Sequence, residues 1–225
     1  MYSNLGFLKA ESSGSPGPGP GPDEGTFPSI ASLTLTQDGN SPYNAVMPAA
    51  VAAGDLLIIL TKVVSGTGGL TDVPSSWARV VAGIESIMYK WAAGTEGGTL
   101  VTMPVFGSVT LLFTVLRIQG AALAQNPEGA YLSPVNTATP NPPSVDPTWA
   151  DANNLFIAWT SSTGVRNIVS YPAGYTFHQQ KSDGANGTSF IAAKRSINSA
   201  LEDPGVFTIS SSANCAAATI AVRGA

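Results

Sequence analysis

Short runs of β-branched and aromatic residues, separated by turn residues, follow one another from Ser29 to the end of the chain. No stretch has the sustained period of about 3.6 residues that marks an amphipathic helix. In the run SIMYKW at 86–91, the bulky side chains Ile87, Tyr89 and Trp91 fall on alternate positions, which is typical of a strand with one buried face. The pattern therefore predicts an all-β protein.

The same pattern gives the positions of the individual strands. The run 110–118 is apolar on both faces, which predicts a strand at the centre of a sheet. The predicted strands cover residues 29–36, 55–63, 78–81, 86–92, 99–105, 108–118, 154–160, 176–181, 188–195, 206–210 and 217–222.

Several strings of the first half recur in the second. GDLLI at 54–58 matches NNLFI at 153–157, PSSW at 74–77 matches PAGY at 172–175, IMYK at 87–90 matches IAAK at 191–194, and VLR at 115–117 matches AVR at 221–223. The offset grows from about 99 to about 106 residues, as two similar strand sets with different loop lengths would give. The copies span about 45–121 and 145–225. We expect them to pack face to face as a jelly-roll β-sandwich, with the Pro-rich segment 133–147 as the crossover.

The N-terminal region differs in composition from the rest of the chain. Residues 14–22 read GSPGPGPGP, which offers few backbone donors and almost no side chains for packing. We therefore assign 14–26 as a Pro/Gly linker between an extended arm, 1–13, and a body domain, 27–225. The arm is too short to form its own core, so its apolar side chains are expected to bind a partner: Tyr2, Leu5, Phe7 and Leu8.

Charge and apolar run length argue against two classes of partner. With 10 Lys and Arg against 14 Asp and Glu, the formal net charge is -4, so no basic field is available for a nucleic-acid backbone. The longest apolar runs, 56–60 and 111–116, are far shorter than the roughly 20 residues of a membrane-spanning helix. The first residues lack the basic start and apolar core of a secretory signal, so synthesis and assembly in a cytoplasm are expected.

No residue pattern predicts catalysis, metal binding or a cofactor. His178 is the one histidine and has no matching Cys, His or acidic cluster, so a structural or surface role is expected. Cys215 is the one cysteine, which excludes an internal disulfide and favours a small buried residue. The acidic residues, Glu96 and Glu202 among them, fall in or beside predicted turns and are expected to be solvated. The protein is therefore predicted not to be an enzyme.

The aromatic residues leave a second role open, because such side chains can form a platform on which sugar rings stack. Trp77 and Tyr175, however, hold equivalent positions after the turns of the two halves, which favours packing at the start of a strand. The candidates for the platform are Trp77, Trp91, Trp149, Trp159, Tyr43, Tyr131, Tyr171 and Tyr175.

Several of these strings resemble a group of tailed-bacteriophage virion proteins. The resemblance is carried by AGDLLI at 53–58, KWAAGTEGGT at 90–99, PAGYT at 172–176, DPGVFT at 203–208 and AATIAVR at 217–223, and it covers about residue 45 to the C-terminus. Members of that group are jelly-roll modules of capsid decoration (cement) proteins, head fibres and tail appendages, and trimers are common among them.

The resemblance implies a non-enzymatic structural protein of the phage particle. We expect a decoration protein that binds and stabilises the head, forms a trimer, and contacts the major capsid protein or another virion protein. Its expected location is the virion, after assembly in the host cytoplasm. The alternative is a carbohydrate-binding module of a tail fibre or spike, because the resemblance does not choose between head and tail.

Overall fold

The computed structural model describes residues 26–81, 86–183 and 188–225, and within these ranges the chain forms strands, turns and loops without a helix. The all-β prediction is therefore confirmed. The arm residues Tyr2, Leu5, Phe7 and Leu8 lie outside the described residues. The strands are β1 (Ser29–Asp38), β2 (Asn44–Val46), β3 (Leu56–Gly66), β4 (Gly69–Leu70), β5 (Ala78–Val81), β6 (Ile87–Trp91), β7 (Leu100–Thr102), β8 (Val105–Phe106), β9 (Val109–Gln119), β10 (Glu128–Thr137), β11 (Asn153–Thr163), β12 (Ile168–Ser170), β13 (Thr176–Asp183), β14 (Thr188–Asn198), β15 (Thr208–Ile209) and β16 (Ala213–Arg223).

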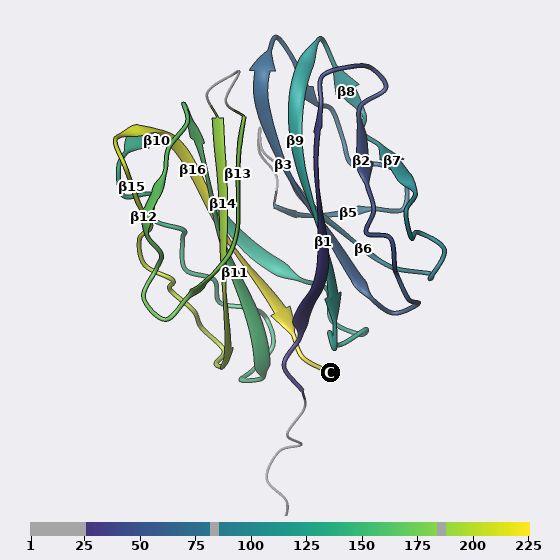
Figure 1. Cartoon of the computed structure of the whole chain (residues 1–225). Helices are drawn as coiled ribbons and strands as arrows, with labels where there is room; N and C mark the ends of the chain where they lie inside the picture. The colour runs from purple at the N-terminus through teal and green to yellow at the C-terminus, as the bar shows by residue number, and fades with distance from the viewer. Residues whose placement is uncertain (1–25, 82–85, 184–187) are drawn as a thin grey trace, which may run out of the picture.

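Two five-stranded antiparallel sheets form the body, and each takes its strands from one half of the chain. The first has the order β1-β9-β3-β6-β5 and the second has the order β10-β16-β11-β14-β13. The sheets lie face to face as a β-sandwich, with the short strand pairs on the two outer sides (Figure 1). Each strand of the first sheet therefore has a counterpart at the same place in the second sheet. The corresponding pairs are β1 and β10, β3 and β11, β5 and β13, β6 and β14, and β9 and β16.

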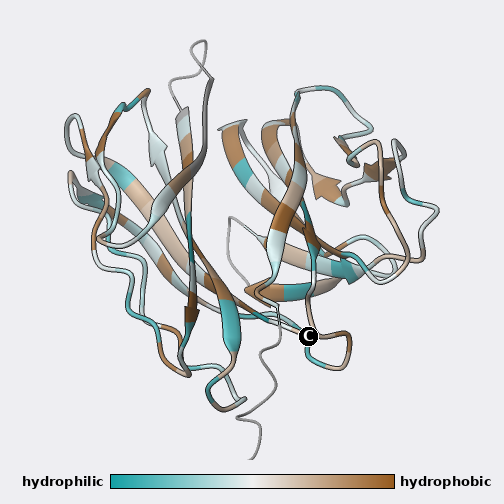
Figure 2. Cartoon of the chain, turned by 60° about the horizontal axis from the view of Figure 1, so that its bottom comes forward, coloured by the Kyte–Doolittle hydropathy of each residue, from teal (hydrophilic) through white to brown (hydrophobic). Residues whose placement is uncertain are grey.

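Apolar side chains are buried both between the sheets and on their outer faces. Ile58 and Ile157 lie in the central core between the sheets. Leu57 and Phe156, their neighbours along the same strands, pack beneath the outer pairs, which are β2–β7 and β4–β8 over the first sheet and β12–β15 over the second. Burial on both faces explains the continuous apolar runs, which show as brown stretches along the strands of the first sheet in Figure 2.

The two halves repeat one turn closely. In each half, the amide of the aromatic residue before an edge strand donates to the carbonyl of the proline three residues earlier, at 3.1 Å for both Trp77 and Tyr175. The residue before the aromatic has a positive φ in both turns, 67° at Ser76 and 77° at Gly174. The match between PSSW and PAGY is thus also a match of backbone shape.

Strand register corrects the predicted match between IMYK and IAAK. Leu57 lies opposite Lys90 in the first sheet, and its counterpart Phe156 lies opposite Arg195 in the second. Lys90 therefore corresponds to Arg195 and not to Lys194. Successive residues of a strand point to opposite faces of the sheet. Arg195 therefore lies on the same face of its sheet as Lys90 does, and Lys194 lies on the other face.

The predicted crossover at 133–147 is wrong in its first part, because residues up to Thr137 belong to β10. The halves are instead connected by residues 120–127. Pro134 obscured the strand, since proline cannot donate to a ladder. β10 accommodates it because it is an edge strand whose register shifts between Leu132 and Val135.

The edge strands β5 and β10 contact each other and close one side of the sandwich. A Cβ added to Gly129 of β10 would lie 2.9 Å from Val80 Cγ1 and 2.9 Å from the carbonyl oxygen of Thr219. Only the contact with Val80 is across the sheets, because Thr219 belongs to β16, the neighbour of β10 in the same sheet. Both contacts are too short for a real side chain, so a glycine at 129 leaves room for Val80 of β5 and for the adjacent strand.

Candidate functional site

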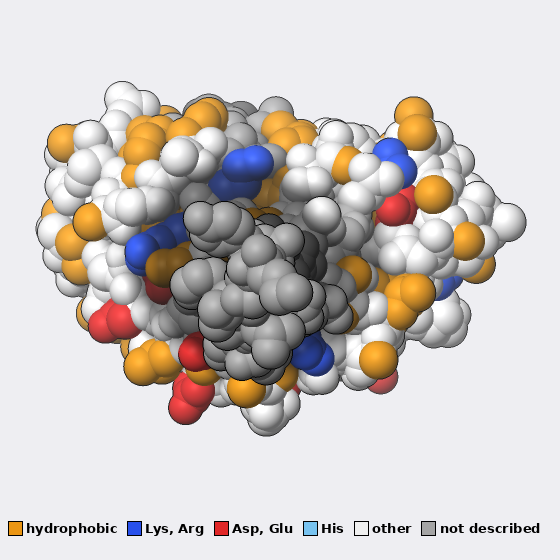
Figure 3. Space-filling view, turned by 90° about the horizontal axis from the view of Figure 1, so that it is seen from below, with side chains coloured by type: hydrophobic (Ala, Val, Ile, Leu, Met, Phe, Trp, Pro, Cys, Tyr) orange, Lys and Arg blue, Asp and Glu red, His pale blue; other side chains and the backbone are white. Residues whose placement is uncertain are grey.

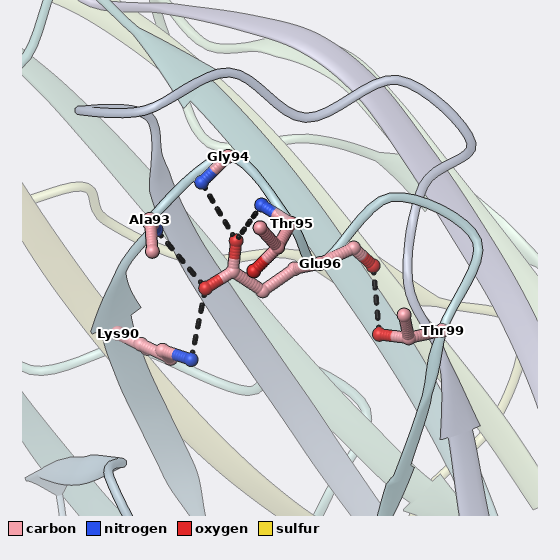
Figure 4. A network of polar contacts seen from close by, with 6 residues as sticks. All are labelled: Lys90, Ala93, Gly94, Thr95, Glu96 and Thr99. Carbon is pink, nitrogen blue, oxygen red and sulfur yellow. Dashed lines mark hydrogen bonds and ion pairs between the residues drawn. The ribbon is translucent and has the colours of Figure 1, made fainter.

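A buried carboxylate, Glu96, organises the turn that follows β6. Its Oε1 accepts the amide of Ala93 at 3.0 Å, and its Oε2 accepts the amides of Gly94 at 2.9 Å and Thr95 at 3.0 Å. The ammonium of Lys90, on β6, donates to Oε1 at 2.9 Å (Figure 4). Glu96 is only 7% exposed, so the expectation of a solvated turn residue is wrong.

The electrostatics of this cluster keep Glu96 ionised. Burial alone would raise the pKa of its carboxyl, but the amide hydrogen bonds and the charge of Lys90 outweigh burial and lower the pKa to about 2. The Lys90–Glu96 pair is therefore a unit without net charge that fixes the turn.

The second half contains the corresponding cluster. Arg195 Nη1 donates to Glu202 Oε1 at 2.9 Å, and Glu202 is 5% exposed, so it too differs from the solvated residue expected from the sequence. Burial, and after it the negative charge of Glu202, raises the pKa of the nearby Tyr175 hydroxyl. Each half thus joins a cation on the strand next to the edge strand to a buried carboxylate.

A further buried ion pair lies in the first half, and the residues at the corresponding places of the second half do not form one. Asp55 accepts from Arg117 Nε at 2.5 Å and from the Ala52 amide at 2.7 Å. Leu57 lies opposite Arg117, whereas Phe156 lies opposite Ala221, so the predicted match of Arg117 with Arg223 is also wrong.

Neutral groups replace this pair in the second half. Asn154 takes the place of Asp55, accepts from Trp149 Nε1 at 3.0 Å and donates through Nδ2 to the Ser199 carbonyl at 2.7 Å. The acid and its cation are therefore replaced together, which avoids leaving one buried charge without its partner.

A cavity of about 500 Å³ opens beside the Lys90–Glu96 pair. One wall is the repeated turn at 73–77, with Trp77 among its lining residues, and the opposite wall is the segment 99–104, which includes β7. This cavity is the first candidate functional site.

The base of the sandwich is the second candidate site. The Ala225 amide donates to the Gly120 carbonyl at 2.9 Å, and the Ala122 amide donates to the Arg223 carbonyl at 2.9 Å. The chain also enters here, because a Cβ on Gly224 would lie 2.7 Å from the Thr26 carbonyl oxygen. The view from this end shows apolar side chains dispersed among polar and charged ones, with no single large patch on the visible part of the face (Figure 3).

Most of the aromatic side chains considered for a sugar platform instead fill the cores. Five are buried: Trp77, Trp149, Trp159, Tyr43 and Tyr175. The partly buried ones, Trp91, Tyr131 and Tyr171, belong to different elements. Burial of Trp77 and Tyr175 agrees with the packing role expected from their positions in the sequence.

The remaining candidate residues have separate places in the fold. His178 lies at the register shift of β13, between Phe177 and Gln179, and Cys215 is buried on β16. Among the described residues, no three His, Cys, Asp or Glu side chains are grouped so as to hold a metal ion. The same residues include no helix long and apolar enough to cross a membrane.

Comparison with protein-family models, with curated proteins and with solved structures gives no match.

Sequence reasoning missed the two carboxylate clusters because their members meet across strands and turns. The signal that could have found them is a cation on a strand followed six or seven residues later by a glutamate, as in Lys90 to Glu96 and Arg195 to Glu202. Its recurrence in both halves distinguishes the pattern from a chance pair of charges.

Proposed function

We propose that the chain is a non-enzymatic structural protein of a bacteriophage particle, foremost a decoration protein that binds the head. We propose further that its sandwich is of the jelly-roll type. Two features support this type: the two antiparallel sheets pack face to face, and in each sheet the first strand lies beside the last.

The buried acids support a structural role. Asp55, Glu96 and Glu202 each accept a hydrogen bond from a cation of a neighbouring strand, at distances of 2.5 to 2.9 Å. Carboxylates held in this way have a fixed position and charge, which suits the maintenance of a fold. Two of the three pairs also recur at corresponding places, as parts of a duplicated framework do.

The observation that carries the proposal is the base. The beginning of the described chain, its C-terminal residues and the connection between the halves meet there. Phe27, which follows Thr26, and Leu123, within the connection, are 41% and 63% exposed. The segment that carries Tyr2, Leu5, Phe7 and Leu8 is joined to the body at this end. Arm and base can therefore form one attachment surface, and each buried apolar side chain would add about 1.5–3 kcal/mol.

Deletion of residues 2–25 tests this assignment. The truncated protein is expected to keep its melting temperature, because residues 29–223 form both five-stranded sheets, but to be lost from purified phage particles. A double variant, Phe27→Ser with Leu123→Ser, tests how much the base contributes to binding the particle. It is expected to reduce incorporation into particles partially. Normal incorporation of the truncated chain would show that the sandwich alone carries the binding surface.

Copy number separates the decoration protein from the alternative of a tail-fibre module. A decoration protein is expected to be present in numbers comparable to the major capsid protein, as measured by quantitative mass spectrometry of purified heads. A few copies confined to tails would favour the tail-fibre module, and absence from particles would contradict both.

A further inference from the structure

The cavity beside the Lys90–Glu96 pair has the size and the fixed walls of a small-molecule site. Its volume of about 500 Å³ lies within the usual range for such sites, roughly 300–1,000 Å³. Main-chain hydrogen bonds hold both walls: Trp77 donates to Pro74 at 3.1 Å, and Met103 donates to Tyr43 at 2.8 Å. A ligand would therefore meet a preformed surface, which lowers the entropic cost of binding.

The charge of the cavity favours a neutral ligand. Lys90 and Glu96 are its charged lining residues, and they neutralise each other at 2.9 Å. Glu96 takes one of the three ammonium hydrogens of Lys90, so the ammonium can still donate to a ligand oxygen. Neither a strongly anionic nor a strongly cationic ligand would find an opposite net charge here.

Hydroxyl groups and apolar side chains alternate around the opening. Ser75 and Ser76 are exposed on one wall, and Thr99 and Thr102 are exposed on the other. The two threonine hydroxyls donate within the protein, Thr99 to the Glu96 carbonyl at 2.7 Å and Thr102 to Asn44 Oδ1 at 2.8 Å, which leaves their oxygens able to accept.

Apolar groups complete the lining, with Leu100 62% exposed and Trp77 8% exposed. A sugar ring presents the same combination, because its edge carries hydroxyl groups and its faces carry C–H groups.

The second half provides an internal comparison. Phe207 donates its amide to the Pro140 carbonyl at 3.0 Å, much as Met103 does to Tyr43. The segment from the buried carboxylate to this contact runs over 96–103 in the first half and over the shorter 202–207 in the second. The longer segment of the first half supplies the wall that holds Thr99, Leu100 and Thr102.

We propose that this cavity binds a neutral saccharide through the hydroxyls of its two walls, the remaining ammonium hydrogens of Lys90 and the exposed apolar side chain of Leu100. The inference does not rest on the proposed decoration function, since a head protein and a tail module could both carry such a site.

The test is a glycan array of neutral oligosaccharides, with sialylated and sulfated glycans as anionic comparisons, followed by calorimetry with the strongest neutral ligand. The full chain is expected to bind neutral glycans in preference to anionic ones. Ser75→Trp, which would fill the opening from an exposed turn position, is expected to weaken binding by about tenfold or more.

Ala173→Trp is the matched control, because Ala173 holds the same position in the repeated turn of the second half. It is expected to bind as the wild type does. If Ser75→Trp fails to fold, Thr102→Trp fills the cavity from the opposite wall and provides the same test. Absence of neutral-glycan binding, a preference for anionic glycans, or equal binding by the folded cavity-filling variant and the control would each overturn the proposal.

Discussion

At the scale of single residues, Glu96 fixes a turn by accepting three amide hydrogens and one ammonium hydrogen. Glu96→Gln removes the charge and one acceptor oxygen, so it is expected to lower the free energy of unfolding by about 1–3 kcal/mol at pH 7. Urea denaturation would measure this. Asp72→Asn is the control, because Asp72 is 76% exposed and its ion pair with Arg79 is expected to contribute little.

The effect of Glu96→Gln should depend on pH. The folded-state pKa of about 2 lies below the ordinary value of 4.5, so the contribution of the carboxylate is complete above pH 4.5 and is lost as the pH falls toward 2. The difference in unfolding free energy between wild type and variant should therefore shrink over this range. A difference that stays constant would contradict the assigned role.

The Asp55–Arg117 pair allows a test that the second half suggests. Asp55→Asn and Arg117→Ala each leave one partner of a buried pair alone and are expected to destabilise by about 3–5 kcal/mol. The double variant reproduces the residues at the corresponding places, Asn154 and Ala221. Its destabilisation should be smaller than the sum of the two by about 1–3 kcal/mol in a double-mutant cycle. Simple additivity would show that the two side chains do not stabilise each other.

At the scale of elements, the contact between β5 and β10 depends on Gly129. Gly129→Ala would place a methyl group 2.9 Å from Val80 Cγ1 on β5 and 2.9 Å from the Thr219 carbonyl oxygen on β16, so it is expected to destabilise by about 1–3 kcal/mol. Gly69→Ala in β4 is the control, because its Cβ would lie 3.7 Å from Phe106, an ordinary contact distance. Thermal unfolding of the two variants measures the difference, and equal melting temperatures would contradict the tight packing around Gly129.

The long strands could be predicted from the sequence because their period and β-branched residues are local properties. The edge strand β10 could not, since Pro134 is compatible with a strand only where one side of its backbone is unpaired, and that depends on the neighbouring strand. β2, β4 and β12 are two or three residues long and show no period. The register of the strands could not be predicted from the repeated sequence strings either. Lys194 and Arg195 are adjacent cations, and only the pairing of the strands identifies Arg195 as the counterpart of Lys90.

The candidate site was less predictable than the fold. The glycine-rich run that contains Glu96 indicated a turn, which is correct, but the burial of its carboxylate depends on Lys90 and on the segment 99–104. The cavity likewise depends on two segments that are separated in the chain and brought together by the first sheet. The sequence contains no local signal for such a meeting.

At the scale of the whole molecule, β1 and β13 are edge strands without a proline, whereas β5 is covered by β10 and β10 contains Pro134. Unpaired strand edges tend to pair with other chains, so we expect a closed trimer in which neighbouring copies cover them. Light scattering at micromolar concentration should give three times the chain mass. Leu35→Lys on β1 is expected to dissociate the trimer, whereas Val169→Lys on β12 is not. A wild-type monomer would contradict this expectation.

The base also bears on how the polypeptide could be rearranged. Thr26 and Gly224 lie side by side there, and the connection 120–127 between the halves passes through the same place. The order in which the two halves are synthesised is therefore not imposed by the packing of the sheets. A circular permutant that joins Ala225 to Thr26 and opens the chain within 122–127 would begin with the second half and retain every strand pair. In such a scaffold, a peptide fused to either end would emerge from the same face.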